Sequence, residues 1–260
     1  MKIKEAILDS APIHQAAHGF VRDRSIVTNA SCHVNKPLVV NLDLKDFFDY
    51  VRYPRVIGIF RWLGYNLEVS RCLALLTTYR PNLGQLENAH APKFVCRQFR
   101  HAVQGAPTSP MLANLASYRL DRRMNGLAIR FHADYTRYAD DLTFSGGEPF
   151  TRGMIRFLPL VKQIVVNEGF RLNHRKMRFM RPGERQEVTG VIVNEKPNAR
   201  REDYDRLKAI IHNAKKASSL ESQNRDGHSD FRAHLLGRIG HIGRLNPARG
   251  QKLLESMRTL

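Results

Sequence analysis

The sequence predicts an α+β fold, in which a small sheet and its helices come first and a helical region ends the chain. Two strand-like stretches predict the sheet: residues 38–44 are a short apolar run, and residues 134–147 place β-forming residues on both sides of Ala-Asp-Asp. From residue 198 onward the apolar residues recur mainly at three- and four-residue steps, which is a helical pattern. We therefore divide the chain into residues 1–197 and residues 198–260.

The composition is that of a globular protein with a strongly basic surface. The chain has 260 residues, 42% of them hydrophobic, so it can bury a substantial core. Its formal net charge is +18, and the basic residues recur from Arg22 to Arg258. This charge favours a polyanionic partner, nucleic acid first. Charge alone leaves open a merely solvated surface or an anionic membrane surface.

The cysteine count and the hydropathy favour a reducing, cytoplasmic location. Cys32, Cys72 and Cys96 are an odd number without a C-x-x-C pair, which predicts neither a disulfide framework nor a zinc site. No stretch approaches the roughly 20 apolar residues of a membrane span. We expect a soluble cytoplasmic protein without a membrane partner.

The first half of the chain predicts one strand followed by helices. Residues 38–44 read as a buried strand that delivers an acid, Asp43, at its end. Residues 53–64 and 67–79 have helical periodicity, which predicts an antiparallel helix pair packed under the sheet. Residues 107–124 begin with prolines and hydroxyl residues and then become periodic, which predicts one capped helix.

The second half predicts a hairpin, a helix, two further strands and the helical end of the chain. Residues 134–147 form a hairpin that presents Asp140 and Asp141 at its tip. The remaining expected elements are a helix at about 152–168, strands near 171–180 and 187–194, and helices at 201–216, 231–246 and 247–260, with a polar loop at 221–230.

Asp43, Asp140 and Asp141 are candidate ligands of a metal site for phosphoryl transfer. Two magnesium ions about 4 Å apart can neutralise the attacking and leaving oxygens when carboxylates hold them. The alternatives are a helix cap for Asp43 and turn chemistry for the pair, which explain each part but not the joint occurrence. Asp46 and Asp49 fit the first turn of a helix and are expected to be structural.

Several segments resemble the motifs of a known family. YADD (138–141), LDLKDFF (42–48) and QGAPTSP (104–110) resemble the core motifs of reverse transcriptases. Three more are similar to bacterial retron reverse transcriptases: AHGFVRDRSIVTNASCH (17–33) with its NAxxH segment, VTG (188–190), and LLGRIGHIGRLNPARG (235–250). The resemblance covers nearly the whole chain.

This resemblance implies a right-hand polymerase. Residues 1–197 would hold partial fingers and the palm, and residues 198–260 would form a helical, RNA-binding thumb. By position, Asp43 and Asp140 would bridge two Mg²⁺ ions and Asp141 would support the site. The implied activity is nucleotidyl transfer by an RNA-directed DNA polymerase.

The resemblance also implies a nucleotide pocket. Phe48 would exclude ribonucleotides by crowding the sugar 2′ position, although a core phenylalanine is an even alternative. Lys176 would lie near the triphosphate, with a solvated lysine as a serious alternative. The segment that would line the pocket is Gln104, Gly105, Ala106 and Pro107, which as a bare sequence is only a turn.

A third set of residues is expected to contact RNA. Its members are Arg22, Arg24, Asn29, His33, Val188, Thr189, Gly190 and Arg238. Arg22 and Arg24 suit phosphates and surface ion pairs equally. For His33 the alternative is a satisfied buried histidine, and for Arg238 it is a solvated helix face.

Retron reverse transcriptases imply a particular product. They copy part of a structured noncoding RNA, starting from the 2′-hydroxyl of a guanosine, into branched RNA-linked single-stranded DNA. The implied partners are this RNA as template and primer, the RNA–DNA hybrid product, deoxynucleoside triphosphates and a retron effector protein in antiphage defence.

The chain departs from the family pattern at its start. Relatives usually have a further N-terminal stretch that forms the first finger strands, so we expect incomplete fingers here, through a late start assignment, a second chain that supplies them, or a fragment. The alternative functions are a catalytically impaired, polymerase-derived RNA-binding protein and a reverse transcriptase of the group II intron type.

Overall fold

A four-stranded antiparallel sheet forms the centre of the computed structural model, which describes residues 2–80, 99–217 and 219–258. The strand order is β2-β3-β1-β4. The strands are β1 (Leu38–Asp43), β2 (Ala133–Tyr138), β3 (Asp141–Gly146) and β4 (Arg178–Met180). The strand expected at 38–44 and the hairpin expected at 134–147 are confirmed, and so is the α+β class.

Side chains alternate between the two faces of this sheet. On β1, Val40 and Leu42 belong to a first apolar cluster, whereas Val39 belongs to a second one. Asp43 has the same parity as Val39, so it projects toward the side of the second cluster. The acid end of the sheet therefore opens on the face away from the first cluster.

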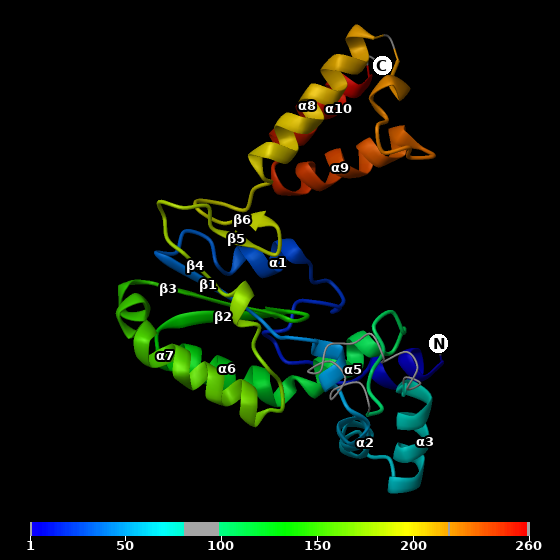
Figure 1. Cartoon of the computed structure of the whole chain (residues 1–260), viewed down its shortest axis with the longest axis vertical. Helices are drawn as coiled ribbons and strands as arrows, with labels where there is room; N and C mark the ends of the chain where they lie inside the picture. Colours follow the sequence, from blue (N-terminus) through cyan, green and yellow to red (C-terminus); the bar gives the residue numbers. More distant parts are fainter. Residues whose placement is uncertain (1, 81–98, 218, 259–260) are drawn as a thin grey trace.

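Two long helices cover the face of the first cluster: α6 (Tyr118–Arg130) and α7 (Glu148–Asn167) (Figure 1). The ring of Phe157 on α7 packs edge-on against Phe144 of β3, with centroids 5.0 Å apart. The one helix expected at 107–124 is wrong, because Ser117 ends α5 (Ser109–Ala116) and begins α6. Apolar periodicity runs through that single-residue break and does not reveal it.

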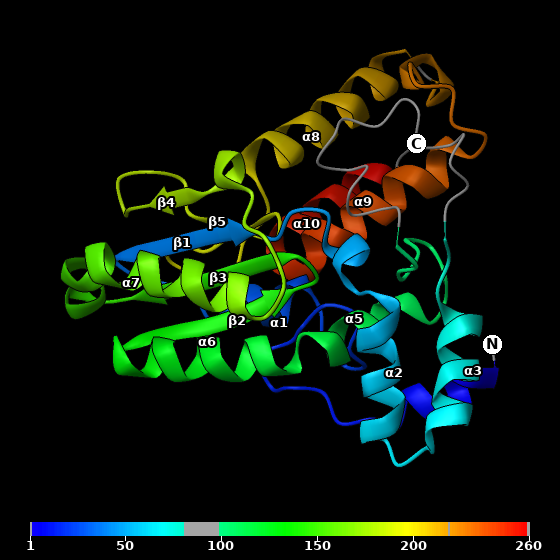
Figure 2. The same ribbon diagram turned by 60° about the horizontal axis from the view of Figure 1, so that its bottom comes forward.

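The expected helix pair is present as α2 (Tyr53–Trp62) and α3 (Leu67–Thr77). These helices lie beside α5 at one end of the molecule and not under the sheet, where α6 and α7 lie instead (Figure 2). Three short turns complete this part of the chain, at η1 (Lys4–Leu8), η2 (Phe47–Tyr50) and η4 (His174–Lys176).

The opposite face of the sheet is covered by α1 (Ile26–Ser31) and by a small hairpin of β5 (Glu187–Val188) and β6 (Val191–Ile192). Its turn is Thr189-Gly190, with φ of 47° and 83°. Positive φ at both residues suits a tight two-residue hairpin, and glycine reaches it without steric cost. The VTG segment is therefore the tip of this hairpin.

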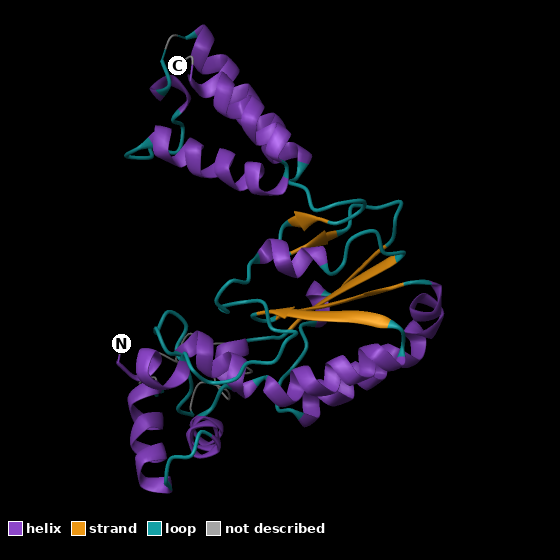
Figure 3. Ribbon diagram, turned by 180° about the vertical axis from the view of Figure 1, so that it is seen from behind, coloured by secondary structure: helices purple, strands orange, loops and turns teal. Residues whose placement is uncertain are grey.

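Helices form the end of the chain, as expected (Figure 3). They are α8 (Arg201–Lys216), α9 (Phe231–Leu245) and α10 (Pro247–Arg258), with a short turn η5 (Glu221–Gln223) in the polar loop. The helices α9 and α10 touch where Gly243 meets Gly250. The second apolar cluster joins α8, α9 and α10 to Val188 and Val191 of the small hairpin.

Two absences bear on the expectations from composition. In the parts of the chain that are described, no helix is both long and apolar enough to cross a lipid bilayer. Cys32 and Cys72 are free and exposed, while Cys96 lies outside the described residues.

Candidate active site

The register of the sheet brings the three candidate acids to one end of adjacent strands. Asp43, the last residue of β1, lies directly opposite Asp141, the first residue of β3. Asp140 precedes it, and its carbonyl oxygen accepts a 2.9 Å hydrogen bond from the backbone N–H of Leu44. Asp43 is buried and the other two are half-buried. Two chain segments about a hundred residues apart thus deliver the acids to one place.

The turn that carries Asp140 has a constrained backbone. Tyr138 pairs with Asp141, so Ala139 and Asp140 form the two-residue turn between β2 and β3. Ala139 has φ 55°, in the left-handed region that few residues other than glycine adopt. Contacts from the surrounding structure must therefore hold this conformation.

Lys176 lies against the acids, and its expected place near the triphosphate stays a prediction. Its ammonium nitrogen is 2.7 Å from Oδ1 of Asp43, although 63% of the lysine side chain is exposed. The backbone N–H of Asn173 also donates to the Asp43 carbonyl oxygen at 2.8 Å, which brings η4 alongside β1. The hydrogen bond to Asp43 raises the pKa of Lys176, so the ammonium is charged at neutral pH.

The acids carry concentrated negative charge. Burial, followed by repulsion from Asp140 and Asp43, raises the pKa of Asp141 to about 6. Burial also raises the pKa of Asp140. Both pKa shifts mean that burial and neighbouring carboxylates disfavour the ionised forms more than nearby cations such as Lys176 favour them.

The chemistry of these donors suits a divalent metal ion. Carboxylate oxygens are the ligands that Mg²⁺ prefers, and the shared negative charge of the three groups favours a cation among them. Within residues 2–80, 99–217 and 219–258, no three His, Cys, Asp or Glu side chains are gathered closely enough to hold a metal by themselves. The acids therefore fit by donor type and common location, and an ion would have to draw them together.

A cleft of about 300 Å³ connects the acids to the small hairpin. It is lined by Asn41, Leu42, Asp43, Asp141, Lys176, Arg178, Glu187, Thr189 and Gly190. The tip of the VTG hairpin therefore shares a cavity with two of the acids and with Lys176. Asn41, Arg178 and Glu187 are additions that the sequence did not single out, although Asn41 lies two residues before Asp43 on β1.

Apart from Lys176, the expected nucleotide residues lie at two places outside that lining. Phe48 is half-buried, with its ring centroid 5.4 Å from Phe47 and 6.4 Å from Phe20. Phe20 also lies 6.5 Å from Tyr138, so it bridges Phe48 to the acid hairpin. Phe20 was not proposed as a site residue, although it belongs to the AHGF segment.

The segment Gln104, Gly105, Ala106 and Pro107 forms a turn just before α5. Gln104 and Pro107 are exposed, and Gly105 has φ 95°. The positive φ of Gly105 is a backbone conformation that favours glycine, as expected for a segment that approaches a ligand closely. That this segment contacts a nucleotide stays a prediction.

The NAxxH and VTG segments touch each other on the face of the sheet that α1 and the small hairpin cover. Asn29 and His33 are fully buried. The amide of Asn29 donates to the Thr189 hydroxyl at 3.4 Å, while the His33 ring bonds Ser145 and Thr136, both at 2.7 Å. Neither side chain reaches the surface in this structure, so the RNA contact expected of Asn29 and His33 stays a prediction. The alternative of a satisfied buried histidine holds for His33.

Val188 is likewise buried in the second apolar cluster, so within the VTG segment only Thr189 and Gly190 remain available to a ligand. The side chain of Val188 instead fixes the hairpin to the body of the protein. The RNA contact expected of Val188, like those of Asn29 and His33, stays a prediction.

The three expected RNA-binding arginines differ in their surroundings. Arg22 is almost fully exposed and forms a loose ion pair with Asp23. Arg24 donates to the carbonyl oxygens of Gln15 and Ala17, so it holds its own loop together. Arg238 is 3.6 Å from Asp203 and lines a hollow of about 500 Å³ between α8 and α9. Arg22 and Arg238 remain candidates for phosphate contacts, whereas Arg24 is mainly structural.

An antiparallel sheet that carries acids at one end, backed by two helices and followed by a helical region, defines the palm class of nucleic-acid polymerases. Residues 1–211 match the family model described as reverse transcriptase (RNA-dependent DNA polymerase), and the chain belongs to this family, in its retron type. One relative, the retron Ec86 reverse transcriptase of Escherichia coli, is 30% identical over 97% of this chain and 74% of its own length.

Two relatives from Myxococcus xanthus are more similar in sequence. The retron Mx65 reverse transcriptase is 41% identical over 95% of this chain, and the retron Mx162 reverse transcriptase is 39% identical over 98%. The matches cover 55% and 54% of those relatives, so the chain spans about half of their length.

A solved structure shares the fold. Telomerase from Candida albicans, determined with a fragment of telomeric RNA, aligns with 99% of this chain and 55% of its own, with a TM-score of 0.51 and 10% identity. At that identity the likeness concerns the fold alone.

Proposed function

We propose that this protein is an RNA-directed DNA polymerase, a nucleotidyltransferase whose metal ligands are Asp43, Asp140 and Asp141. The observation that carries the proposal is the pairing of Asp43 with Asp141 across β1 and β3, with Asp140 in the adjoining turn. Membership of the reverse transcriptase family supports the same activity.

Two Mg²⁺ ions, when bound there, would neutralise charge on the attacking and leaving oxygens of nucleotidyl transfer. Asp43, Asp140 and Asp141 would hold the ions, with Asp43 and Asp140 as the main ligands and Asp141 in support. The ammonium of Lys176, charged and mostly exposed beside Asp43, is suited to exchange that carboxylate for a phosphate of the nucleotide. Gln104, Gly105, Ala106 and Pro107 would line the pocket for the base and sugar, and Phe48 would select the deoxyribose.

The template and product follow from the retron relatives. We propose that the protein copies a structured noncoding RNA, which also primes the reaction, into branched RNA-linked single-stranded DNA. The net charge of +18 supports a nucleic-acid partner, and Arg22, Arg24, Thr189, Gly190 and Arg238 are the exposed or half-exposed members of the expected RNA contacts. A role in antiphage defence with an effector protein, and a cytoplasmic location, belong to the same proposal.

The decisive experiment is extension of a primer on an RNA template with deoxynucleotides and Mg²⁺. Asp140→Asn should lower incorporation at least about 100-fold, because even residues that only support a metal ligand contribute about 10- to 100-fold. The matched control is Asp134→Asn, which neutralises a half-exposed acid at the other end of the same hairpin and should leave the rate unchanged. Full activity of Asp140→Asn would reject the metal assignment.

The same assay distinguishes an active polymerase from the alternative, a catalytically impaired RNA-binding protein. That alternative predicts tight binding of structured RNA and no incorporation with Mg²⁺ or Mn²⁺, in wild type and in Asp140→Asn alike.

A further inference from the structure

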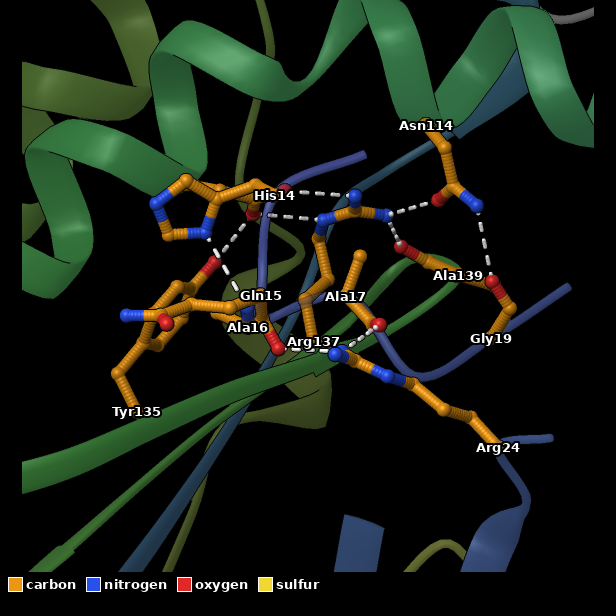
Figure 4. Close-up of polar contacts among 11 residues, drawn as sticks. His14, Gln15, Ala16, Ala17, Gly19, Arg24, Asn114, Tyr135, Arg137 and Ala139 are labelled. Atoms are coloured by element: carbon orange, nitrogen blue, oxygen red, sulfur yellow. Dashed lines mark hydrogen bonds and ion pairs between the residues drawn. The ribbon is translucent and has the colours of Figure 1, made fainter. Parts of the chain in front are cut away.

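A buried arginine lies directly behind the acid turn. Arg137, on β2, has no exposed surface, and its side chain points to the face of the sheet that α6 covers (Figure 4). Its Nε and Nη2 atoms donate to the two carboxylate oxygens of Asp121 on α6, at 2.8 and 2.7 Å. The Tyr135 hydroxyl donates to the same carboxylate at 2.8 Å. These bonds by themselves would fasten the sheet to α6.

The remaining nitrogen of the guanidinium serves a different purpose. Nη1 of Arg137 donates to the carbonyl oxygen of Ala139 at 3.0 Å and to Oδ1 of Asn114 at 3.1 Å. Ala139 is the turn residue with positive φ, immediately before Asp140. A strained backbone persists only where its surroundings hold it, and this bond fixes the peptide that leads into Asp140.

The N-terminal loop closes the network from the other side. The amide of Asn114 donates to the Gly19 carbonyl oxygen at 2.9 Å. Gly19 lies so close to the turn that an added Cβ would be 2.6 Å from the backbone nitrogen of Ala139. The turn is therefore held between Arg137 beneath it and Gly19 beside it, and Asn114 links the two.

The same loop is tied to β2 at the arginine itself. The backbone N–H of Arg137 donates to Ala16, and the N–H of His18 donates to the Arg137 carbonyl, both at 2.7 Å. A side-chain change at Arg137 leaves these backbone bonds available, so it tests the guanidinium separately from the strand.

We propose that Arg137 is a positioning residue for the metal-binding acids, acting through the Ala139 carbonyl and through Asn114. The inference rests on the proposed function, because it assigns a purpose to the turn only if Asp140 holds a metal ion. The fork of a guanidinium can bond Asp121 with one edge and the turn with its other nitrogen. A lysine, with one ammonium group, can neutralise Asp121 but cannot reach both places.

The test measures Mn²⁺ binding to the intact chain by electron paramagnetic resonance, in the absence of nucleotide and template. Arg137→Lys should weaken Mn²⁺ binding about 10- to 100-fold, the range found for residues that orient metal ligands. Asn114→Ala, which removes the second support without leaving a buried charge unpaired, should weaken it in the same direction. Circular dichroism and urea unfolding establish that each variant is folded.

Arg55→Lys is the matched control. Arg55 is also largely buried, but its guanidinium bonds the Glu168 carbonyl oxygen at 2.7 Å and lies over the ring of Phe170. Arg55→Lys should lose about as much stability as Arg137→Lys but keep its Mn²⁺ affinity within about twofold. If Arg137 had only a structural role, Arg137→Lys would also keep its Mn²⁺ affinity.

The outcomes are distinct. Folded Arg137→Lys with wild-type Mn²⁺ affinity would overturn the inference, and if that variant does not fold, wild-type affinity of Asn114→Ala would do so. Mn²⁺ binding that survives Asp140→Asn would instead reject the metal site on which the proposed function rests, and this inference with it.

Discussion

His33 shows how a single buried residue links the motif segments to the sheet. Its two ring nitrogens bond hydroxyls on neighbouring strands, and the helix before it packs on the small hairpin. Burial lowers the pKa of His33 to about 3; Asp134 opposes this shift, while His18 and Lys36 add to it. The residue is therefore neutral in the folded protein at any moderate pH.

We predict that this burial makes folding sensitive to acid. The folded pKa of His33 lies below its unfolded value of about 6.5, so its contribution is intact above pH 6.5 and is lost as pH falls toward 3. Each pH unit in that window costs about 1.4 kcal/mol of unfolding free energy for one such group. His18, with its pKa lowered to about 4, adds a second group.

Urea unfolding at several pH values between 7 and 5 measures this slope. In His33→Gln the free energy of unfolding should depend less on pH, by about 1.4 kcal/mol per pH unit below 6.5. Equal slopes in wild type and variant would contradict the assignment of a neutral buried histidine.

Phe48 gives a second prediction at the residue scale. Phe48→Ala opens space between Phe47 and Phe20 beside the acid hairpin, so discrimination against ribonucleotides should fall by on the order of 10- to 200-fold. Phe48→Tyr keeps the ring and should keep the selectivity. Ratios of single-nucleotide incorporation for matched deoxy and ribo substrates measure the effect, and an unchanged ratio in Phe48→Ala would exclude the sugar gate.

The acids could be found from the sequence because they stand in short motifs whose chemistry requires carboxylates. Arg137 could not, since an arginine on an alternating strand looks the same whether it faces water or a buried partner such as Asp121. Asn29 and His33 are the opposite case, because polar residue types in a motif suggest contact with a ligand, whereas both side chains are buried here. Only the packing of α1 on the sheet shows that both are enclosed.

At the scale of elements, periodicity predicted where helices form better than what they pack against. The antiparallel pair α2 and α3 exists, but the apolar face of α2 that carries Val56 and Phe60 does not specify whether its partner is a sheet or another helix. The break between α5 and α6 at Ser117 is a change of axis, which leaves the apolar spacing intact.

The crossing of α9 and α10 is sensitive to one methyl group. A Cβ on Gly250 would lie 2.4 Å from the Cα of Gly243, so Gly250→Ala should lower the free energy of unfolding by about 1–3 kcal/mol through overpacking. Gly240→Ala, on the same pair of helices, adds a Cβ with nothing within 4 Å. That control should gain roughly 0.5–1 kcal/mol from helix propensity. Urea unfolding distinguishes them, and equal effects would contradict the close crossing.

At the scale of the whole molecule, the positive charge should dominate binding to RNA. We predict that the logarithm of the binding constant falls linearly with the logarithm of salt concentration, and that Arg22→Gln reduces the slope by about one if Arg22 contacts a phosphate. Arg152→Gln is the control, because this exposed residue lies on α7, behind the sheet. Filter binding over a salt series measures both, and identical slopes for the two variants would exclude Arg22 from the contact.

The second apolar cluster continues through the boundary expected at residue 197. Its members include Val188 and Val191 from the small hairpin, and Leu207 and Ile239 from the helices beyond. A chain cut at this boundary would leave apolar surface facing water on both pieces, so neither piece is expected to be an autonomous folding unit. Heating should melt the acid-bearing sheet and the terminal helices in one transition, and the two separately expressed pieces should become protease-resistant only when they are mixed.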